Sequence, residues 1–261
     1  MKTDIRRPFS WILVTLLLFA LISCRSTIKE EYYDNGTLKS SIEYKGKKKN
    51  GEAREYYPNG YTRSIIHYIK DVEDGLSSYY NQDGTITMDV EMKDGKKNGR
   101  MRTYFFTGNR EMECFYKDDK LEGKQTYFDQ LGNRVTEINY KNDIAEGAYT
   151  TWYSKTETIN GLNAMRCSGQ YKNGQMDGHW TYYDENEMPV GEADFQQGSG
   201  TMITYVNGEK AKETPYVNNM KEGDEKEFDR EGNVLKTTTY QKDRIVAING
   251  EPISCAPETQ P

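Results

Sequence analysis

The sequence has few of the residues from which catalytic and metal sites are built. Its 261 residues include only two histidines, four cysteines and seven prolines. His67 and His179 have no fixed spacing to carboxylates or cysteines, so neither a catalytic triad nor a zinc site is expected. A Walker phosphate loop and the ligand series of a calcium loop are also absent. We therefore expect a protein that is not an enzyme and that uses no metal or cofactor.

Basic residues are also fewer than acidic residues. The formal net charge is -6, and the first 23 residues hold Lys2, Arg6 and Arg7 against the single acid Asp4, so a chain without them is more acidic still. Such a chain is not expected to bind nucleic acid or to adhere by charge to anionic lipid. Acidic residues recur at the predicted turns, where we expect them to serve solubility.

The longest apolar run is confined to the N-terminus. Residues 11–22 follow Lys2, Arg6 and Arg7 and are too few for a comfortable membrane span, which predicts a signal peptide over residues 1–23. The run ends in Leu21-Ile22-Ser23-Cys24, which resembles a bacterial lipobox. The resemblance implies cleavage before Cys24 and lipidation of its thiol and new amino group. Each buried acyl methylene adds roughly 0.8 kcal/mol of membrane affinity.

The predicted location follows from that motif. We expect a membrane-anchored lipoprotein of a bacterial cell envelope, with the outer membrane favoured and its periplasmic or surface side left open. Residues 24–30 are then interpreted as the lipidated cysteine and a short polar tether. The Pro-rich, polar residues 251–261 are expected to be a flexible tail that carries Cys255.

The two central cysteines are predicted to be buried thiols. Cys114 occupies the position that Ile42, Ile66 and Val90 occupy in other repeats, so it replaces an aliphatic side chain. Cys167 is expected on the same face two repeats further on. At ~4.8 Å per strand the two lie about 19 Å apart, beyond the ~7 Å that a disulfide allows between Cα atoms. No bridge between them is expected.

Glycine and aromatic residues are plentiful and regularly spaced. Five glycines recur every 24 residues, and each is followed five positions later by an aromatic residue. The pairs are Gly51 with Tyr56, Gly75 with Tyr80, Gly99 with Tyr104, Gly123 with Phe128 and Gly147 with Trp152. The pattern continues off the strict period, so residues 31–250 are predicted to form an array of one small unit. Residues 154–166 enlarge one loop of that array.

Each unit is predicted to be a β-hairpin. Residues 100–106 and 110–116 are rich in strand formers, and Thr107-Gly108-Asn109 between them supplies a tight turn. The links between hairpins are too short for crossovers, so successive hairpins should pair antiparallel. The expected fold is all-β: an elongated single-layer antiparallel meander of stacked hairpins. Its apolar face must be covered by curling or by self-association, so a homodimer is possible.

Alternation along the strands assigns side chains to two faces. The predicted core face combines first-strand aromatics with second-strand apolar residues: Tyr56, Tyr80, Tyr104, Phe128 and Trp152 with Ile42, Ile66, Val90 and Ile138. A second row of aromatics is assigned to the opposite face. From that row Tyr127, Tyr149, Trp180 and Tyr182 are the candidate binding surface. The alternative is that the row forms cross-strand pairs on a solvated sheet, at about 0.2 to 1 kcal/mol per pair.

Two segments carry a family resemblance. Residues 116–128 and 171–183 each contain a tyrosine, a polar turn, a glycine and two adjacent aromatics, in that order. They resemble the MORN repeat variant of bacterial proteins, including the YwqK-type antitoxins, and the resemblance spans roughly residues 31–250. It implies that the glycines and aromatics are structural and that the function is protein interaction rather than catalysis. Residues 154–166 and 191–200 depart from the pattern.

Three hypotheses for function follow. The leading one is a lipid-anchored, non-catalytic scaffold that holds another envelope protein through a sheet face or through the loop 155–165. The second is a carbohydrate or cell-wall binding module, which requires Tyr127, Tyr149, Trp180 and Tyr182 to form an exposed stacking strip. The third is an antitoxin-like or immunity protein, which requires a toxin partner.

Overall fold

The computed structural model describes residues 26–154 and 163–253, and it divides the chain into two compact units, residues 1–108 and 109–261. In the described residues there is no helix, and every strand pairing is antiparallel. The predicted all-β meander of hairpins is confirmed. The predicted signal peptide, Cys24 and Cys255 lie outside the described residues.

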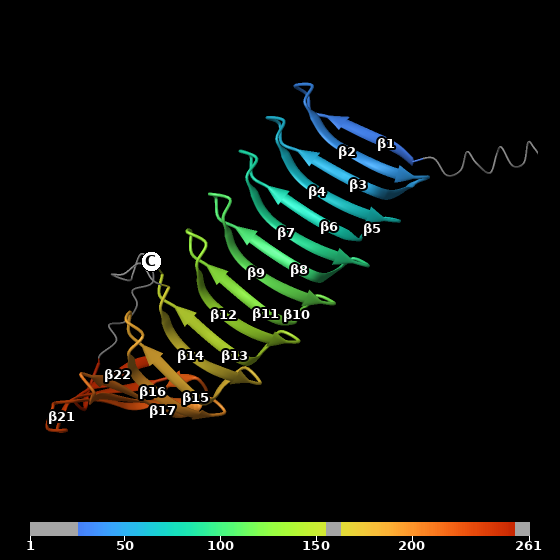
Figure 1. Ribbon diagram of the computed structural model, residues 1–261. Helices are drawn as coiled ribbons and strands as arrows, with labels where there is room; N and C mark the ends of the chain where they lie inside the picture. Colours follow the sequence, from blue (N-terminus) through green and yellow to red (C-terminus); the bar gives the residue numbers. More distant parts are fainter. Residues whose placement is uncertain (1–25, 155–162, 254–261) are drawn as a thin grey trace, which may run out of the picture. The chain divides into compact units, whose positions relative to one another are not determined.

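In the first unit, strands adjacent in sequence lie side by side (Figure 1). Its strands are β1 (Ser26–Tyr32), β2 (Leu38–Lys45), β3 (Lys48–Tyr56), β4 (Thr62–Ile69), β5 (Val72–Glu73), β6 (Gly75–Tyr80), β7 (Ile86–Lys93) and β8 (Lys96–Tyr104). The short β5 and the longer β6 both pair with β4, so together they act as one interrupted strand.

The second unit continues the same hairpin pattern. Its strands are β9 (Arg110–Lys117), β10 (Lys120–Leu121), β11 (Gly123–Phe128), β12 (Arg134–Lys141), β13 (Ile144–Trp152), β14 (Met165–Lys172), β15 (Gln175–Tyr183), β16 (Pro189–Gln196), β17 (Ser199–Val206), β18 (Glu209–Val217), β19 (Met220–Lys221), β20 (Gly223–Phe228), β21 (Val234–Gln241), β22 (Arg244–Ile248) and β23 (Glu251–Pro252). The enlarged loop lies between β13 and β14, and residues 155–162 of it are outside the described part.

Two-residue turns close one end of the hairpins. Asn142 and Asp143 have φ values of 51° and 70°, and Lys70-Asp71 and Asn218-Asn219 repeat the pattern. Positive φ at both central residues is the type I′ geometry, whose twist matches that of the flanking strands. Asn and Asp tolerate this conformation better than other non-glycine residues. These local preferences set the register of each hairpin.

The glycines of the 24-residue period have a different role. Gly51 and Gly99 both have φ of 121°, and each lies opposite an irregularity in the strand pairing. The side chains of Glu43 and Glu91 lie over these glycines, in the space that a Cβ would need. At Gly51 and Gly99 the period therefore records a β-bulge at which neither the backbone nor the space allows a larger residue.

Acidic side chains at the turns join one hairpin to the next. In the first unit Lys49 N donates to Asp71 Oδ1 at 2.7 Å, and Asp71 N donates to Lys49 O at 2.9 Å. The same pair of bonds joins Asp143 to Leu121 and Asp243 to Lys221 in the second unit. The prediction that turn acids serve only solubility was wrong, because these carboxylates satisfy backbone N–H groups of neighbouring repeats.

Tyrosines at the opposite turns make a second set of links. Tyr33, Tyr57 and Tyr153 donate their hydroxyls to the carbonyls of Tyr56, Tyr80 and Tyr183, at 2.7, 2.8 and 2.8 Å. These hydroxyls connect successive repeats within each unit.

The two ends of the predicted array need correction. Residues 24–30 were predicted to be a tether, but Ser26–Tyr32 forms β1, which pairs with β2 along its whole length. Its side chains are all exposed, which explains why composition resembled a linker. At the other end Glu251–Pro252 forms β23, so the predicted tail begins inside a strand, and the residues after 253 are outside the described part.

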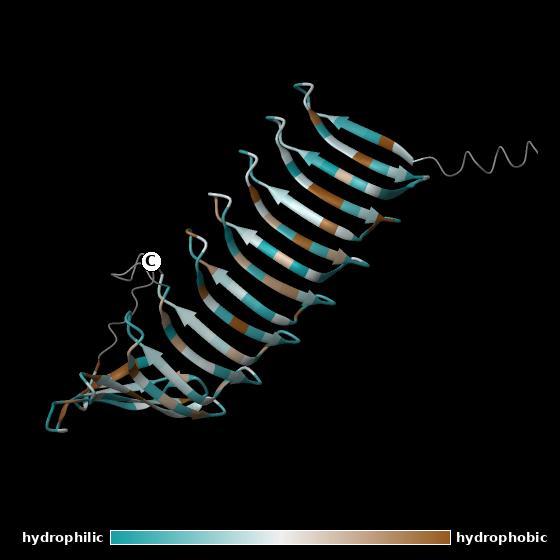
Figure 2. Ribbon diagram, viewed as in Figure 1, coloured by the Kyte–Doolittle hydropathy of each residue, from teal (hydrophilic) through white to brown (hydrophobic). Residues whose placement is uncertain are grey.

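Apolar material is sparse along the strands, which carry isolated apolar bands between polar stretches (Figure 2). The largest buried hydrophobic cluster lies in the second unit and contains Cys167, Met176, Trp180, Ala193 and Phe195. Elsewhere buried positions are often small or polar, as at Ser77 and Gln125. Polar connections between repeats therefore carry much of the specificity that a large core would supply.

One such connection is a buried carboxylate near the C-terminal strands. Glu225 is 4% exposed and accepts hydrogen bonds from Thr214 Oγ1 at 2.8 Å, Lys221 Nζ at 2.9 Å and Lys212 Nζ at 3.3 Å. Burial by itself raises the pKa of this carboxyl, but the hydrogen bonds and the two lysine charges outweigh it and hold the pKa below its ordinary value.

Replacing Asp143 tests the links between turns. Asp143→Gly keeps the positive φ but removes the acceptor of Leu121 N–H, so the local free energy of opening should fall by about 1 kcal/mol. Amide hydrogen exchange at Leu121 should accelerate accordingly. Asp118→Gly, at a turn residue with φ of 50°, is the control and should leave exchange there unchanged. Equal protection of Leu121 in all three proteins would contradict the assignment.

Glu225 should make the second unit acid-sensitive. Because the folded pKa lies below the ordinary value, the carboxylate stabilises the fold above that value, and this contribution is lost as pH falls through the folded pKa. Glu225→Gln should cost about 1 to 3 kcal/mol at pH 7, and the difference from the parent protein should narrow below about pH 4. Denaturant unfolding at several pH values measures this, with exposed Glu231→Gln as control. A constant gap down to pH 3 would argue against the assignment.

Candidate binding site

The strand register assigns the two faces of each sheet. Residues opposite one another on neighbouring strands share a face. Val90 lies opposite Ser77, and Met88 lies opposite Tyr79, so Tyr79 is on the face of Val90. Tyr104 instead donates its hydroxyl to Asp89 on the other face, at 2.7 Å. The second-strand residues of the predicted core face are confirmed, but first-strand aromatics such as Tyr104 were assigned to the wrong face.

The reason is the irregular pairing near each hairpin end. Between Tyr79 and Tyr80 the partner on β7 changes from Met88 to Ile86, so one strand advances by two residues while the other advances by one. The alternation of side chains between the two faces of one strand therefore does not predict the faces in the next strand. The same shift occurs between Tyr127 and Phe128 and between Thr151 and Trp152.

Trp180 is the centre of the buried cluster in the second unit. Its side chain is 2% exposed, and its ring lies 5.5 Å from that of Tyr149, 5.3 Å from Tyr171 and 6.1 Å from Phe195. These three ring contacts are possible because Gly169 has no side chain. The indole ring occupies the space that a Cβ of residue 169 would need. Ala193, opposite Trp180 on β16, is also small.

The four candidate residues therefore do not form an exposed strip. Trp180 is buried, whereas Tyr127 is 41% exposed and lies opposite Met112 on β9, beyond the cluster. Tyr149 and Tyr182 are partly buried and pack against the cluster. The structure brings Tyr149, Trp180 and Tyr182 together and leaves Tyr127 apart. The prediction of an exposed stacking surface was wrong, because Trp180 is buried and Tyr149 and Tyr182 pack against its cluster.

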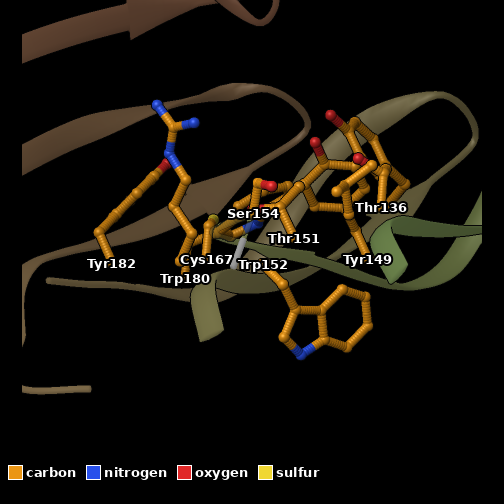
Figure 3. Close-up of a pocket in the computed structure, with 11 residues that line it drawn as sticks. Thr136, Tyr149, Thr151, Trp152, Ser154, Cys167, Trp180 and Tyr182 are labelled. Carbon is orange, nitrogen blue, oxygen red and sulfur yellow. The ribbon is translucent and has the colours of Figure 1, made fainter. Parts of the chain in front are cut away.

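A hollow of about 600 Å³ lies where β12, β13, β14 and β15 meet. Tyr182 lies at one end and Thr136 and Tyr149 at the other, with Thr151, Ser154 and Cys167 between them (Figure 3). The other lining residues are Val135, Trp152, Arg166, Tyr171 and Trp180. Aromatic rings thus form much of the wall, and hydroxyl groups supply most of its polar atoms.

The polar atoms of the hollow are neutral at physiological pH, apart from one guanidinium. Burial raises the pKa of Tyr171 to about 12, with a further contribution from Tyr149. Burial also raises the pKa of Tyr182. These phenols keep their protons and can donate hydrogen bonds. Burial likewise raises the pKa of the Cys167 thiol to about 12, so it is a poor nucleophile.

Several of these groups have no partner within the described part of the chain. The Trp180 indole N–H is buried and makes no hydrogen bond there. No hydrogen bond joins the Tyr149, Tyr171 or Tyr182 hydroxyls to any described residue. Ser154 differs, because its hydroxyl donates to Asp129 Oδ2 at 3.0 Å.

Arg166 is the charged residue that lines the hollow. Its side chain is exposed, and its guanidinium carbon lies 5.5 Å from the centre of the Tyr153 ring. No carboxylate lies within 4.0 Å of it among the described residues. Sequence reasoning missed Arg166 because it stands in the segment where the repeat pattern is interrupted. The available signal was a cation directly before Cys167, the cysteine that lies two residues before Gly169.

The remaining sequence predictions on chemistry are partly answered. His67 and His179 lie in strands β4 and β15, and His179 Nδ1 is 3.0 Å from Asp194 Oδ1. Cys114 and Cys167 are both buried and neither forms a disulfide, which confirms the predicted lack of a bridge between them. In the part of the chain that the structure describes, no group of His, Cys, Asp or Glu residues is arranged to hold a metal ion. None of the described residues belongs to a helix long and apolar enough to span a bilayer.

The fold and its repeated turns define a β-hairpin repeat protein. The MORN repeat variant matches five stretches, residues 28–45, 49–70, 97–118, 121–142 and 221–242, which occur in both units. The MORN repeat variant thus describes these five stretches of the chain, as the sequence resemblance indicated. Most residues that line the hollow belong to β13, β14 and β15 and lie between the matched stretches, where the loop is enlarged, whereas Val135 and Thr136 of β12 belong to the stretch 121–142.

Comparison with other proteins adds little about function. No curated protein matches the chain. One similar structure is that of accessory secretory proteins 1, 2 and 3 of Streptococcus pneumoniae, with 17% identity over 48% of this chain and 18% of that one, and a TM-score of 0.16. A second is TcdB2–TccC3, with 12% identity over 81% of this chain and 14% of that one, and a TM-score of 0.17. This chain spans less than a fifth of either, and such scores carry no functional inference.

Gly169 provides a test of the aromatic cluster. Gly169→Ala would place a methyl group inside the Trp180 ring position, so the indole must move, at a cost of about 1 to 3 kcal/mol. Its φ is not in the positive range, so the cost would come from the clash alone. Thermal unfolding and near-ultraviolet circular dichroism measure the effect. Ser168→Ala, one residue earlier on the other face, should change stability by less than about 0.5 kcal/mol, and equal effects would contradict the packing.

Proposed function

We propose that the protein is a lipid-anchored, non-catalytic interaction scaffold of a bacterial cell envelope. The hollow in the second unit is the observation that carries the interaction part of this proposal. It combines aromatic walls, hydroxyl groups and the Arg166 guanidinium, which has no carboxylate within 4.0 Å among the described residues, and this is the composition of a binding site. The anchor rests on the lipobox-like Leu21-Ile22-Ser23-Cys24.

The buried thiol supports a binding role over catalysis. Cys167 is the nucleophile-type residue of the hollow, and its raised pKa leaves almost none of it as thiolate near pH 7. The lining holds no histidine or carboxylate that could act as a base for it. The hollow is thus suited to hold a ligand, and nothing in its lining suits it to transform one.

The carbohydrate alternative has lost its main support. It required an open aromatic strip on which sugar rings could stack, and Trp180 at 2% exposure presents no open face. The antitoxin alternative rests on the family resemblance alone. An interaction scaffold is therefore the function that the described geometry favours.

The proposal predicts a partner whose capture depends on the anchor. Full-length protein is crosslinked briefly in its own envelope and captured, and the retained proteins are identified by mass spectrometry. A specific partner should be retained by the parent protein and by Cys255→Ala, and lost or strongly reduced with Cys24→Ala. Incorporation of an alkyne-labelled fatty acid should follow the same pattern, because acylation requires the Cys24 thiol.

Two results would overturn the proposal. Equal fatty-acid labelling of the parent and Cys24→Ala proteins would remove the lipid anchor. Recovery of cell-wall fragments with no protein partner would remove the scaffold and restore the glycan alternative.

A further inference from the structure

The hollow stands out by its charge in an acidic protein. The chain carries a formal net charge of -6, and 29% of its residues are charged. Arg166 lines the hollow together with neutral side chains only, and neither Asp nor Glu is among them. A charged group that enters would therefore meet one cation and no lining anion.

Arg166 also differs from most other arginines of the described residues. Seven of the nine, at positions 54, 63, 100, 102, 110, 134 and 230, have a carboxylate oxygen within 4.0 Å. Arg166 and Arg244 have none among the described residues, and Arg244 does not line the hollow. The guanidinium of Arg166 is held beside Tyr153, and no acidic group in the described part of the chain uses its hydrogen-bond donors. Its planar fork matches a carboxylate in two parallel hydrogen bonds.

We propose that the hollow binds a single carboxylate side chain, a Glu or Asp presented by an otherwise uncharged or basic segment of a partner protein. Arg166 is the charge partner, and the hydroxyls of Tyr149 and Tyr182, which line the same hollow, are the neutral donors. This inference rests on the proposed scaffold function and names the chemistry that the scaffold would recognise. The partner segment carries few acids because the rest of this chain repels them.

The geometry favours a carboxylate over other anions. Phosphate sites usually combine several cations or a row of backbone N–H groups, whereas the lining of this hollow supplies one arginine. A sugar acid would need an open ring face on which to stack, and Trp180, at the centre of the buried cluster, is only 2% exposed.

The two tryptophans of the chain beyond residue 23 both line the hollow, which makes fluorescence a direct probe. They are Trp152 and Trp180, and Trp11 is the third tryptophan of the full sequence. Full-length protein with Trp11→Phe, in detergent, is titrated with acetyl-Phe-Glu-amide, whose phenyl group can contact the tyrosines. Acetyl-Phe-Gln-amide, glucuronate and inorganic phosphate are titrated in parallel.

The Glu peptide should bind about tenfold or more tightly than the Gln peptide, because the lost interaction is a charged hydrogen-bonded pair. Arg166→Gln should abolish this preference, and Arg166→Lys should keep part of it. Arg244→Gln is the matched control and should leave it unchanged. Tyr182→Phe, which removes only the hydroxyl, should weaken the Glu peptide several-fold, with unchanged circular dichroism confirming the fold.

Three outcomes would overturn the inference. They are equal binding of the Glu and Gln peptides, an unchanged preference in Arg166→Gln, or binding of glucuronate or phosphate as tight as that of the Glu peptide. These outcomes are separate from failure of the scaffold. If the parent protein captures the envelope partner but binds the Glu and Gln peptides equally, the carboxylate site is wrong and the scaffold stands.

Discussion

Hydrogen bonding between successive hairpins is the constraint on which the rest of the structure depends. Each strand finds its partners in the next strand along the chain, so the register of every repeat must be set locally. Type I′ turns set it within a hairpin, and the carboxylates of Asp71, Asp143 and Asp243 set it between hairpins. A bulge glycine in each repeat then allows the strand to twist.

The setting of the register by turn residues explains the composition of the chain. Because polar groups at the turns hold the register, the sheet faces do not need a continuous aliphatic core, and positions such as Ser77 and Gln125 are buried without large apolar side chains. Aromatic residues concentrate where small neighbours make room for them. Gly169 and Ala193 do so for Trp180, and the hollow is the space left beside that cluster.

Much of the fold could be predicted from the sequence, because it depends on local chemistry. The 24-residue spacing, the hairpins and the turns follow from glycine, Asn and Asp preferences that act over a few residues. The sheet face of each aromatic residue could not be predicted. The shift in strand pairing between Tyr79 and Tyr80 reverses the face that regular alternation would assign. Nor could β1 be distinguished from a linker, because all of its side chains are exposed.

The candidate site was only partly within reach of the sequence. Tyr149 and Tyr182 were singled out and do line the hollow, yet as parts of its wall rather than as an open strip. Trp180 was expected on the surface because its strand alternates, and only the register with Gly169 and Ala193 reveals it as buried. Arg166 depends on long-range placement, since its significance lies in the absence of a nearby acid among the described residues.

The most direct test of this account is the accessibility of Trp180 in a protein that carries Trp11→Phe and Trp152→Phe, so that it is the single tryptophan. We predict blue-shifted emission and weak quenching by acrylamide, as for an indole enclosed by Tyr149, Tyr171 and Phe195. Red-shifted emission with quenching close to that of a free indole would place Trp180 in solvent. That result would contradict the register, the aromatic cluster and the hollow built upon it.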